Sequence, residues 1–198
     1  MTQTVVIDEV KRKTSIFKQL MSLHWIMATC FLLVYVTGAI VARFQTGRFY
    51  SGPKGLLSFF HQSIGVLVMM LLIARISLLI RVVWSKYSRR LPSPTHPWML
   101  KFILHSVLYG FMLIAPVTGF LIANSYGSDV PFFGLATVTP IFAKNPAIVE
   151  TARSLHFWLS YLFLAFIILH ILAHWSIVRR SWRRIQTRIS NMQIFHYK

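Results

Sequence analysis

Four long apolar runs dominate the pattern of hydrophobic and polar positions along the chain. They cover approximately residues 21–42, 56–80, 102–123 and 155–177. Each run has the length of about 20 residues that an α-helix needs to cross the hydrocarbon core of a bilayer. The connections between the runs are too short to hold a second globular domain. The pattern therefore predicts an all-α fold, an integral membrane four-helix bundle, with residues 1–198 forming one membrane domain.

The segments outside these runs have characters of their own. The residues before Met21 are polar and charged, which predicts a short amphipathic or disordered lead-in. The connection 124–154 is rich in apolar residues, which predicts a cap lying in the membrane interface. Residues 178–198 form a basic tail after the fourth run. Cys30 is the only cysteine, so the chain has no internal disulfide, and the side chain is expected to be a small buried one.

Charge is very unevenly distributed. The chain has 21 lysines and arginines against four acidic residues, a balance that in a soluble protein would point to nucleic acid. Here most basic residues gather in segments 11–18, 81–101 and 179–198, which all lie on one side of the predicted bundle. By the positive-inside rule, both termini are then cytoplasmic. The same residues are expected to contact anionic lipids, and no nucleic-acid partner is predicted.

Two histidines stand fourteen residues apart inside the fourth run, His156 and His170. On an α-helix this separation is about 21 Å along the axis and within about 40° of the same face. Imidazoles are expensive inside hydrocarbon unless something uses them. Two imidazoles on one face, one near each end of a membrane span, suit two stacked haems that each need a second ligand from a neighbouring helix.

The other histidines of the spans supply such second ligands. Because neighbouring helices run in opposite directions, the six histidines of the spans fall into two layers. The predicted outer layer contains one pair, His61 with His156. The inner layer offers His24 or His105 against His170 or His174, and helix geometry leaves that choice open.

Iron held by two imidazoles has no open coordination position and transfers electrons rather than activating oxygen. The competing interpretation is that the histidines only form hydrogen bonds between helices. Zinc is a weaker alternative because no cysteine or acidic residue accompanies them. Gly38 and Gly65 share helix faces with His24 and His61, where a missing Cβ would let a flat macrocycle approach, although ordinary helix packing also uses such glycines.

Arg75 is the second unusual residue of the spans, on the same face as His61 and fourteen residues beyond it. A guanidinium at that depth needs an anion, and all four acidic residues lie outside the spans. One interpretation is a bond to a haem propionate. The other is that Arg75 snorkels to the inner membrane surface.

The chain also contains an internal repeat. Leu23-His24 and Leu104-His105 each precede a Val-Thr-Gly sequence by the same interval. His61 and Arg75 have the spacing of His156 and His170. The repeat predicts two related pairs of helices.

The ordered set of motifs resembles the bacterial cytochrome b561 family, four-helix di-haem cytochromes of the inner membrane. The residues that carry the resemblance are Ser22-Leu23-His24-Trp25, His61 with Gly65 and Arg75, Ala115-Pro116-Val117-Thr118-Gly119, and His156 with His170. The resemblance implies two haem b groups ligated by His24 with His170 and by His61 with His156. It leaves His105 and His174 to hydrogen-bond a propionate or a quinone.

The resemblance also implies a multi-pass protein of the bacterial inner membrane that passes electrons between a donor and membrane quinone. One type of family member is a superoxide oxidase, so periplasmic superoxide is a candidate donor, and the chain would then be an oxidoreductase. The alternative is a cytochrome b anchor or relay subunit of a dehydrogenase or hydrogenase complex. A third hypothesis, a haem-free scaffold or small transporter, makes no use of the two layers of imidazoles.

Overall fold

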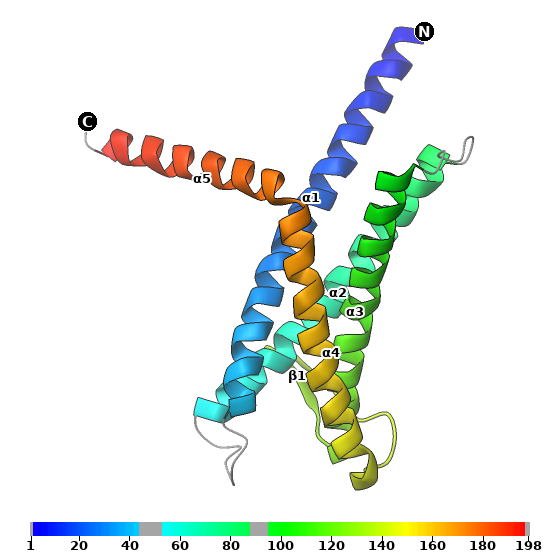
Figure 1. Ribbon diagram of the computed structural model, residues 1–198, viewed down its shortest axis with the longest axis vertical. Helices are drawn as coiled ribbons and strands as arrows, with labels where there is room; N and C mark the ends of the chain where they lie inside the picture. Colours follow the sequence, from blue (N-terminus) through cyan, green and yellow to red (C-terminus); the bar gives the residue numbers. More distant parts are fainter. Residues whose placement is uncertain (1, 44–52, 88–94, 197–198) are drawn as a thin grey trace.

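The computed structural model of the protein describes residues 2–43, 53–87 and 95–196, and its four long helices run in alternating directions (Figure 1). The helices are α1 (Thr2–Arg43), α2 (Pro53–Tyr87), α3 (His96–Tyr126) and α4 (Pro146–Ala173). Both chain termini lie at one end of the bundle, which we call the terminus end. The opposite end carries two short strands and is called the strand end. Among the basic residues of the chain, Arg48, Arg89 and Arg90 lie outside the described residues.

Each long helix contains a stretch that is long and apolar enough to cross a membrane. These stretches are Lys18–Arg43, Gly55–Trp84, Trp98–Tyr126 and Pro146–Ala173. Their outward faces expose large apolar side chains, for example Leu32 (64% exposed) and Ile73 (61%). An apolar outer surface of this kind is suited to lipid rather than to water. The prediction of an all-α fold with four apolar spans is therefore confirmed.

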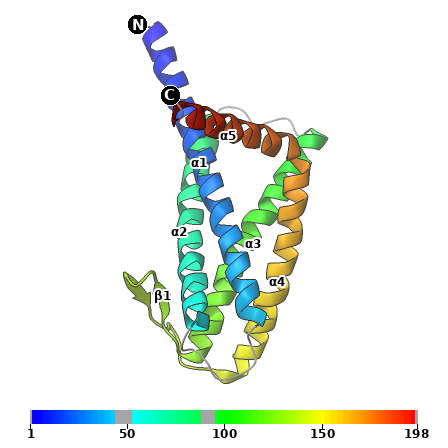
Figure 2. The same ribbon diagram turned by 90° about the vertical axis from the view of Figure 1, so that its left-hand side faces the viewer.

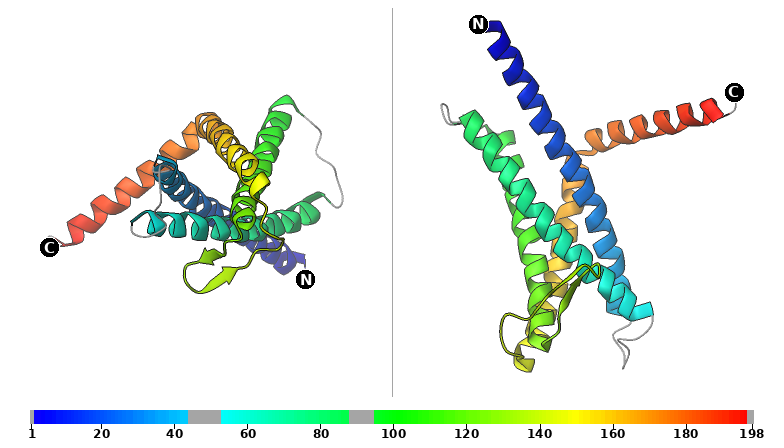
Figure 3. Two further views of the ribbon diagram at one scale, coloured as in Figure 1. Left: turned by 90° about the horizontal axis from the view of Figure 1, so that it is seen from below. Right: turned by 180° about the vertical axis from the view of Figure 1, so that it is seen from behind.

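The helices pack as two antiparallel pairs, α1 against α2 and α3 against α4, and α2 also packs against α3 (Figures 2 and 3). Cys30, Ile64 and Val68 form a buried cluster between α1 and α2, which confirms Cys30 as a small buried residue. Helices α1 and α4 meet through long side chains instead. The hydroxyl of Tyr35 donates to the carbonyl oxygen of Ser160 at 2.9 Å, and the ring of Phe163 contacts that of Tyr35.

The connection after α3 folds into a two-stranded antiparallel hairpin, β1 (Val130–Phe132) with β2 (Ala136–Val138). Its turn contains Gly134 at φ 74°, a left-handed conformation that costs glycine little. The hairpin lies against α2 at the strand end (Figure 2). The buried hydroxyl of Ser63 holds it there, donating to the carbonyl oxygen of Pro131 at 3.1 Å and accepting from the amide of Phe133 at 3.0 Å.

The fourth helix is displaced from the predicted range of 155–177. It begins at Pro146, which lacks a backbone N–H and fits the first turn, and the side chain of Asn145 caps it by accepting from the amide of Ala147 at 3.2 Å. Polar residues in the first two turns, such as Glu150 and Arg153, hid these turns from the hydropathy pattern. The helix ends where His174 leaves helical geometry, at φ −115° and ψ 22°.

The basic tail and the lead-in also differ from the sequence predictions. The tail begins as helix α5 (Trp175–His196), which runs across the direction of the four long helices (Figure 1). The residues before Met21 continue α1 without a break from Thr2. Both segments have low hydropathy because a helix outside the hydrocarbon core can be polar on most of its surface, so hydropathy did not identify these helical turns.

Asn124, near the end of α3, holds the connection after this helix in place, and its replacement tests this contact. Its buried side chain accepts from the amide of Ile141 at 2.6 Å and donates to the carbonyl oxygen of Phe142 at 3.2 Å. We expect Asn124→Ala to lower the free energy of unfolding by about 2 kcal/mol, because two hydrogen bonds are lost and their partners stay behind. Hydrogen exchange should also become faster at the amide of Ile141. Ser128→Ala, at an exposed position, is the control, and equal stability of the two variants would contradict the assignment.

Candidate functional site

His61 on α2 and His156 on α4 face each other near the strand end. Their ring centroids are 6.2 Å apart and the ring planes are almost perpendicular, at 87°. Both side chains are partly buried. The structure therefore brings together the one pair that the sequence predicted for this layer, and we call it the strand-end pair.

Each ring of the strand-end pair is held by the helix preceding its own in the chain. The Nδ1 atom of His61 lies 3.1 Å from the carbonyl oxygen of Val34, and that of His156 lies 3.0 Å from the carbonyl oxygen of Ala115. A carbonyl oxygen only accepts, so Nδ1 must carry the proton in both rings. The hydroxyls of Thr37 and Thr118 lie 3.4 and 3.1 Å from the same Nδ1 atoms. Each Nε2 is thereby left with a free lone pair for a metal.

Two glycines make this close approach possible. A Cβ atom at Gly38 would lie 2.8 Å from Cε1 of His61, and a Cβ atom at Gly119 would lie 3.1 Å from Cε1 of His156. Gly38 was predicted to make room for a macrocycle beside His24, but in the structure it makes room for an imidazole of the neighbouring helix. A Cβ atom at Gly65 would meet nothing within 4 Å, so the space beside this glycine is open among the described residues.

Each ring of the strand-end pair lies in a cradle made of a backbone carbonyl, a threonine hydroxyl and a glycine, and the two cradles correspond to the sequence repeat. In the first helix pair, His61 of α2 is contacted by Thr37 and Gly38 of α1. In the second pair, His156 of α4 is contacted by the equivalent residues of α3, Thr118 and Gly119. From the sequence, the Val-Thr-Gly motifs indicated a repeat but not their contact with the imidazoles. The repeat was the available signal, because two equal motifs at equal distances from histidines indicate equal contacts.

Four histidines gather toward the terminus end: His24 on α1, His105 on α3, His170 on α4, and His174 at the junction of α4 with α5. We call them the terminus-end cluster. The ring centroid of His170 is 6.0 Å from that of His24, 5.1 Å from that of His105 and 4.7 Å from that of His174. The rings of His105 and His174 are 5.7 Å apart. The inner layer predicted from the sequence thus exists as a cluster around His170.

Hydrogen bonding in the cluster is uneven. The Nδ1 of His105 donates to the carbonyl oxygen of Lys101 at 2.6 Å, and that of His174 donates to the carbonyl oxygen of His170 at 3.1 Å. The Nδ1 of His170 is buried without a hydrogen-bond partner among the described residues. His24 has ring contacts with His170 and Trp25.

Arg75 reaches into the bundle from α2 toward this cluster. Its Nε donates to the hydroxyl of Tyr109 on α3 at 2.8 Å, and its guanidinium carbon lies 5.8 Å from the centre of the Tyr109 ring. Tyr109 was not among the residues predicted from the sequence, although its position one helical turn after His105 puts it on the same face of α3.

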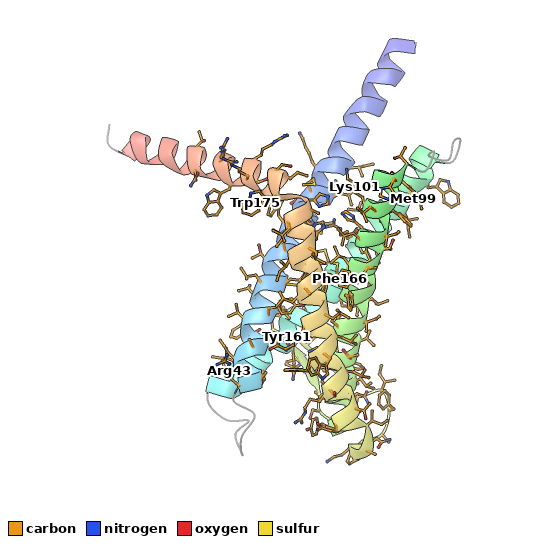
Figure 4. The ribbon with its side chains drawn as sticks, viewed as in Figure 1. Arg43, Met99, Lys101, Tyr161, Phe166 and Trp175 are labelled. Atoms are coloured by element: carbon orange, nitrogen blue, oxygen red, sulfur yellow. The ribbon has the colours of Figure 1, made fainter. Side chains whose placement is uncertain are left out.

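A layer of aromatic rings separates the two groups of histidines. The ring of Phe163, buried on α4 midway between His156 and His170, contacts Phe31 on α1 and Phe111 on α3 at centroid distances of 5.2 and 5.6 Å. Phe166, labelled in Figure 4, extends this layer toward α3 by its contact with Phe111 at 5.4 Å. The same view shows Lys101 and Trp175 at the terminus end and Arg43 at the strand end.

The geometry favours a metal that brings most of its own donors. Among residues 2–43, 53–87 and 95–196, no three or more His, Cys, Asp or Glu side chains are grouped so that they could hold one ion. The strand-end pair provides two opposed imidazoles. A metal bound end-on between two imidazoles separates their centroids by roughly 6.4 Å, twice the sum of a bond of about 2 Å and a ring radius of about 1.2 Å. The observed 6.2 Å fits an iron porphyrin, which needs only two axial ligands from the protein.

Comparison with known proteins agrees with this geometry. The sequence pattern of the prokaryotic cytochrome b561 family matches residues 18–188, which include all four spans and all the histidines described above. The chain is also similar to cytochrome b561 homolog 2 of Escherichia coli (strain K12), with 29% identity over 151 residues, covering 74% of this chain and 76% of that protein. Because the match extends over most of its length, the chain belongs to the prokaryotic cytochrome b561 family, whose members are membrane cytochromes.

Proposed function

We propose that this membrane cytochrome binds two haem b groups and passes electrons through the bundle, from a donor at the strand end to a membrane quinone. Family membership itself implies haem b and haem-based electron transfer. The ligands we propose are His61 with His156 for the strand-end haem and His24 with His170 for the terminus-end haem. The observation that carries the proposal is the presence of two groups of opposed imidazoles, separated by aromatic rings, within one membrane bundle.

The strand-end assignment is supported by the hydrogen bonds of the two rings. Histidines that bind metals almost always donate the other ring N–H to a carbonyl, a carboxylate or water, which fixes the tautomer and the ring orientation. Val34 and Ala115 supply such carbonyls, and the ring separation of 6.2 Å is close to that expected for iron between two imidazoles.

The terminus-end assignment is supported by distances within the cluster. The rings of His24 and His170 are 6.0 Å apart, whereas those of His105 and His174 lie only 5.1 and 4.7 Å from His170. Rings closer than roughly 6 Å leave too little room for a metal between their nitrogens. We therefore propose that His105 and His174 hydrogen-bond a propionate or quinone instead, and that Arg75 binds a propionate through its free guanidinium nitrogens.

The chain's own residues then have defined tasks. A haem carries one electron at a time between its ferric and ferrous states. The imidazoles would hold each haem without leaving a coordination position open, and the apolar bundle would exclude water. Arg43, Lys144 and Arg153 make the described part of the strand end positive, against Asp129 and Glu150. A positive surface attracts an anionic donor, and superoxide is the donor we propose.

The remaining parts of the proposal concern orientation and lipids. With both termini cytoplasmic, the strand end faces the periplasm of a bacterial inner membrane. Helix α5 then lies at the cytoplasmic surface, where a shallow cavity of about 290 Å³ is lined by Trp175, Ser176, Arg179, Arg180 and Arg183. Exposed arginines beside an exposed tryptophan are suited to the phosphates of anionic lipids at the membrane interface.

A second candidate function is that of an anchor or relay subunit for a separate dehydrogenase or hydrogenase. The observation that favours it is the apolar surface of the strand-end connection, where Leu135 is 82% and Ile141 is 78% exposed. Such a surface could receive a partner protein. Purification in a mild detergent distinguishes the two functions, because a relay subunit would retain a partner in fixed ratio and a self-sufficient oxidoreductase would not.

Replacing single histidines tests the ligand assignment. We expect purified protein to contain about two haems per chain with the spectrum of bis-imidazole iron, since each haem needs both its ligands. His61→Ala or His156→Ala should remove about one haem, and so should His24→Ala or His170→Ala. His105→Ala and His174→Ala should retain both haems. If His105→Ala or His174→Ala loses a haem, that histidine is a ligand and takes the place of His24 or His170 in our assignment. Colourless wild-type protein would contradict the proposal as a whole.

The cradle glycines provide a separate test of the strand-end site. A methyl group at Gly38 or Gly119 would push against the imidazole of His61 or His156, at 2.8 and 3.1 Å respectively. We expect Gly38→Ala to lower the occupancy of the strand-end haem more than Gly119→Ala, because its contact is shorter. Gly110→Ala is the matched control, since its Cβ atom would meet nothing within 4 Å. Haem content and the absorption spectrum measure the effect, and equal loss in all three variants would contradict it.

The proposed reaction can be measured directly. Protein loaded with both haems should be reduced by superoxide and should then convert an added quinone to quinol. Replacing Lys144 and Arg153 by glutamine should slow reduction by superoxide about tenfold and weaken its dependence on ionic strength, because attraction between opposite charges accelerates the encounter. Reduction by a neutral donor should be unchanged. If the loaded protein forms no quinol with superoxide, the choice of donor is wrong while the haem assignment stands.

A further inference from the structure

The surroundings of the two imidazole groups differ in a way that bears on electron direction. At the strand end, both Nδ1 groups donate to a backbone carbonyl and lie beside a threonine hydroxyl. At the terminus end, the Nδ1 of His170 is buried with no partner in the described part of the chain. The rings proposed as ligands are therefore hydrogen-bonded in one layer, while the central ring of the other layer lacks this bond.

The second difference is a positive charge. Arg75 lies in the span of α2, and its Nε donates to the hydroxyl of Tyr109 on α3 at 2.8 Å. Tyr109 follows His105 by one helical turn, and the ring of His105 is 5.1 Å from that of His170. Its hydrogen-bond partner on the protein is thus a phenol rather than a carboxylate for Arg75, and Glu150, the one acidic residue within the four described spans, lies in the first turns of α4 at the strand end. The strand-end pair has no arginine or lysine as a hydrogen-bond partner in the described structure; its partners are carbonyls and threonine hydroxyls.

The sequence repeat shows where this asymmetry arises. His61 and His156 correspond to each other, and so do their threonines, but Arg75 of the first helix pair corresponds to His170 of the second. The two pairs therefore match at the strand end and differ at the terminus end. One pair supplies an imidazole at this position and the other supplies a cation.

The two differences would act on different haems, and together they would separate the two haem potentials in one sense. An imidazole that donates its N–H to a carbonyl becomes a stronger base, and a stronger base stabilises ferric iron more than ferrous iron. A nearby cation has the opposite effect, because it repels the more positive ferric state. The strand-end haem should thus be harder to reduce and the terminus-end haem easier to reduce.

We propose that the threonine–carbonyl cradles and the Arg75–Tyr109 pair set the two haems at different potentials, so that a single electron rests on the terminus-end haem. This inference depends on the proposed function, because it requires haems in both layers. Thr37, Thr118, Arg75 and Tyr109 are positioning residues in this scheme. They give the bundle a preferred electron direction, from the strand end to the terminus end, whichever donor and acceptor it serves.

A potentiometric titration of the purified holoprotein tests the order of potentials. The absorbance of the haems should rise in two waves, and each wave can be assigned with variants that keep one haem. His156→Ala retains the terminus-end haem and His170→Ala retains the strand-end haem. We expect the terminus-end haem to be favoured by at least tenfold, which is about 59 mV for a one-electron couple. Equal potentials, or the reverse order, would overturn the inference even if both haems are present.

Substitutions at the terminus end test the cause. Arg75→Gln should make the terminus-end haem about tenfold harder to reduce, a shift of about 59 mV, and should leave the strand-end wave in place. Arg75→Lys keeps the positive charge and should retain most of the wild-type potential. Tyr109→Phe should shift the potential in the same direction as Arg75→Gln, but by less. Arg81→Gln is the control, since Arg81 is exposed on the same helix. If Arg75→Gln does not retain its haem, Tyr109→Phe decides, and an unchanged potential in that variant contradicts the role of the pair.

Substitutions at the strand end test the other half. Thr37→Val and Thr118→Val remove the hydroxyl but keep the branched shape, and each should make the strand-end haem about threefold easier to reduce. Thr29→Val is the control, because the hydroxyl of Thr29 bonds only the carbonyl oxygen of Trp25 on its own helix. The haem content of every variant is measured first, so that loss of a haem, which bears on the ligand assignment, is separated from a change in potential.

Discussion

The hydrogen bond from an imidazole Nδ1 to the backbone carbonyl of a neighbouring helix is the interaction on which this structure depends. Within a membrane no water is available to satisfy a ring N–H, so the partner must come from the protein. A helical carbonyl already accepts from its own helix but has a second lone pair. His61 and His156 reach that lone pair only because Gly38 and Gly119 let the helices approach. One requirement therefore sets the packing of each helix pair, the tautomer of each ring and the nitrogen left free for a metal.

The same requirement explains the organisation of the bundle. Close contact within each helix pair leaves α1 and α4 to meet only through side chains, chiefly through the ring of Phe163. The histidines lie above and below this ring, so one face of α4 serves both layers. The hairpin of β1 and β2 lies at the strand end, where Ser63 holds it against α2. At the terminus end, α4 ends at His174 and α5 continues in another direction. The long helices thus carry the strand-end pair and three histidines of the terminus-end cluster, and His174 lies at the break between α4 and α5.

Much of this was predictable from the sequence, for physical reasons that differ from residue to residue. The four spans followed from hydropathy, and the pairing of His61 with His156 followed from depth alone, because no other intramembrane histidine lies in that layer. Depth could not decide among the four imidazoles of the terminus-end cluster. The carbonyls of Val34 and Ala115 have no side-chain signature, and polar residues such as Glu150 concealed the first turns of α4. Neither interpretation of Arg75 from the sequence included a tyrosine on α3, although its Nε donates to the hydroxyl of Tyr109.

The aromatic layer between the two groups of histidines has a consequence for energy conservation. The rings of Phe31, Phe111 and Phe163 carry no group that can exchange a proton. An electron that crosses this layer would therefore travel without a compensating positive charge. Its passage would work with or against the membrane voltage, at about 2.3 kcal/mol for each 100 mV when the whole membrane is crossed. Electron transfer between the two proposed haems would in this way respond to the membrane voltage.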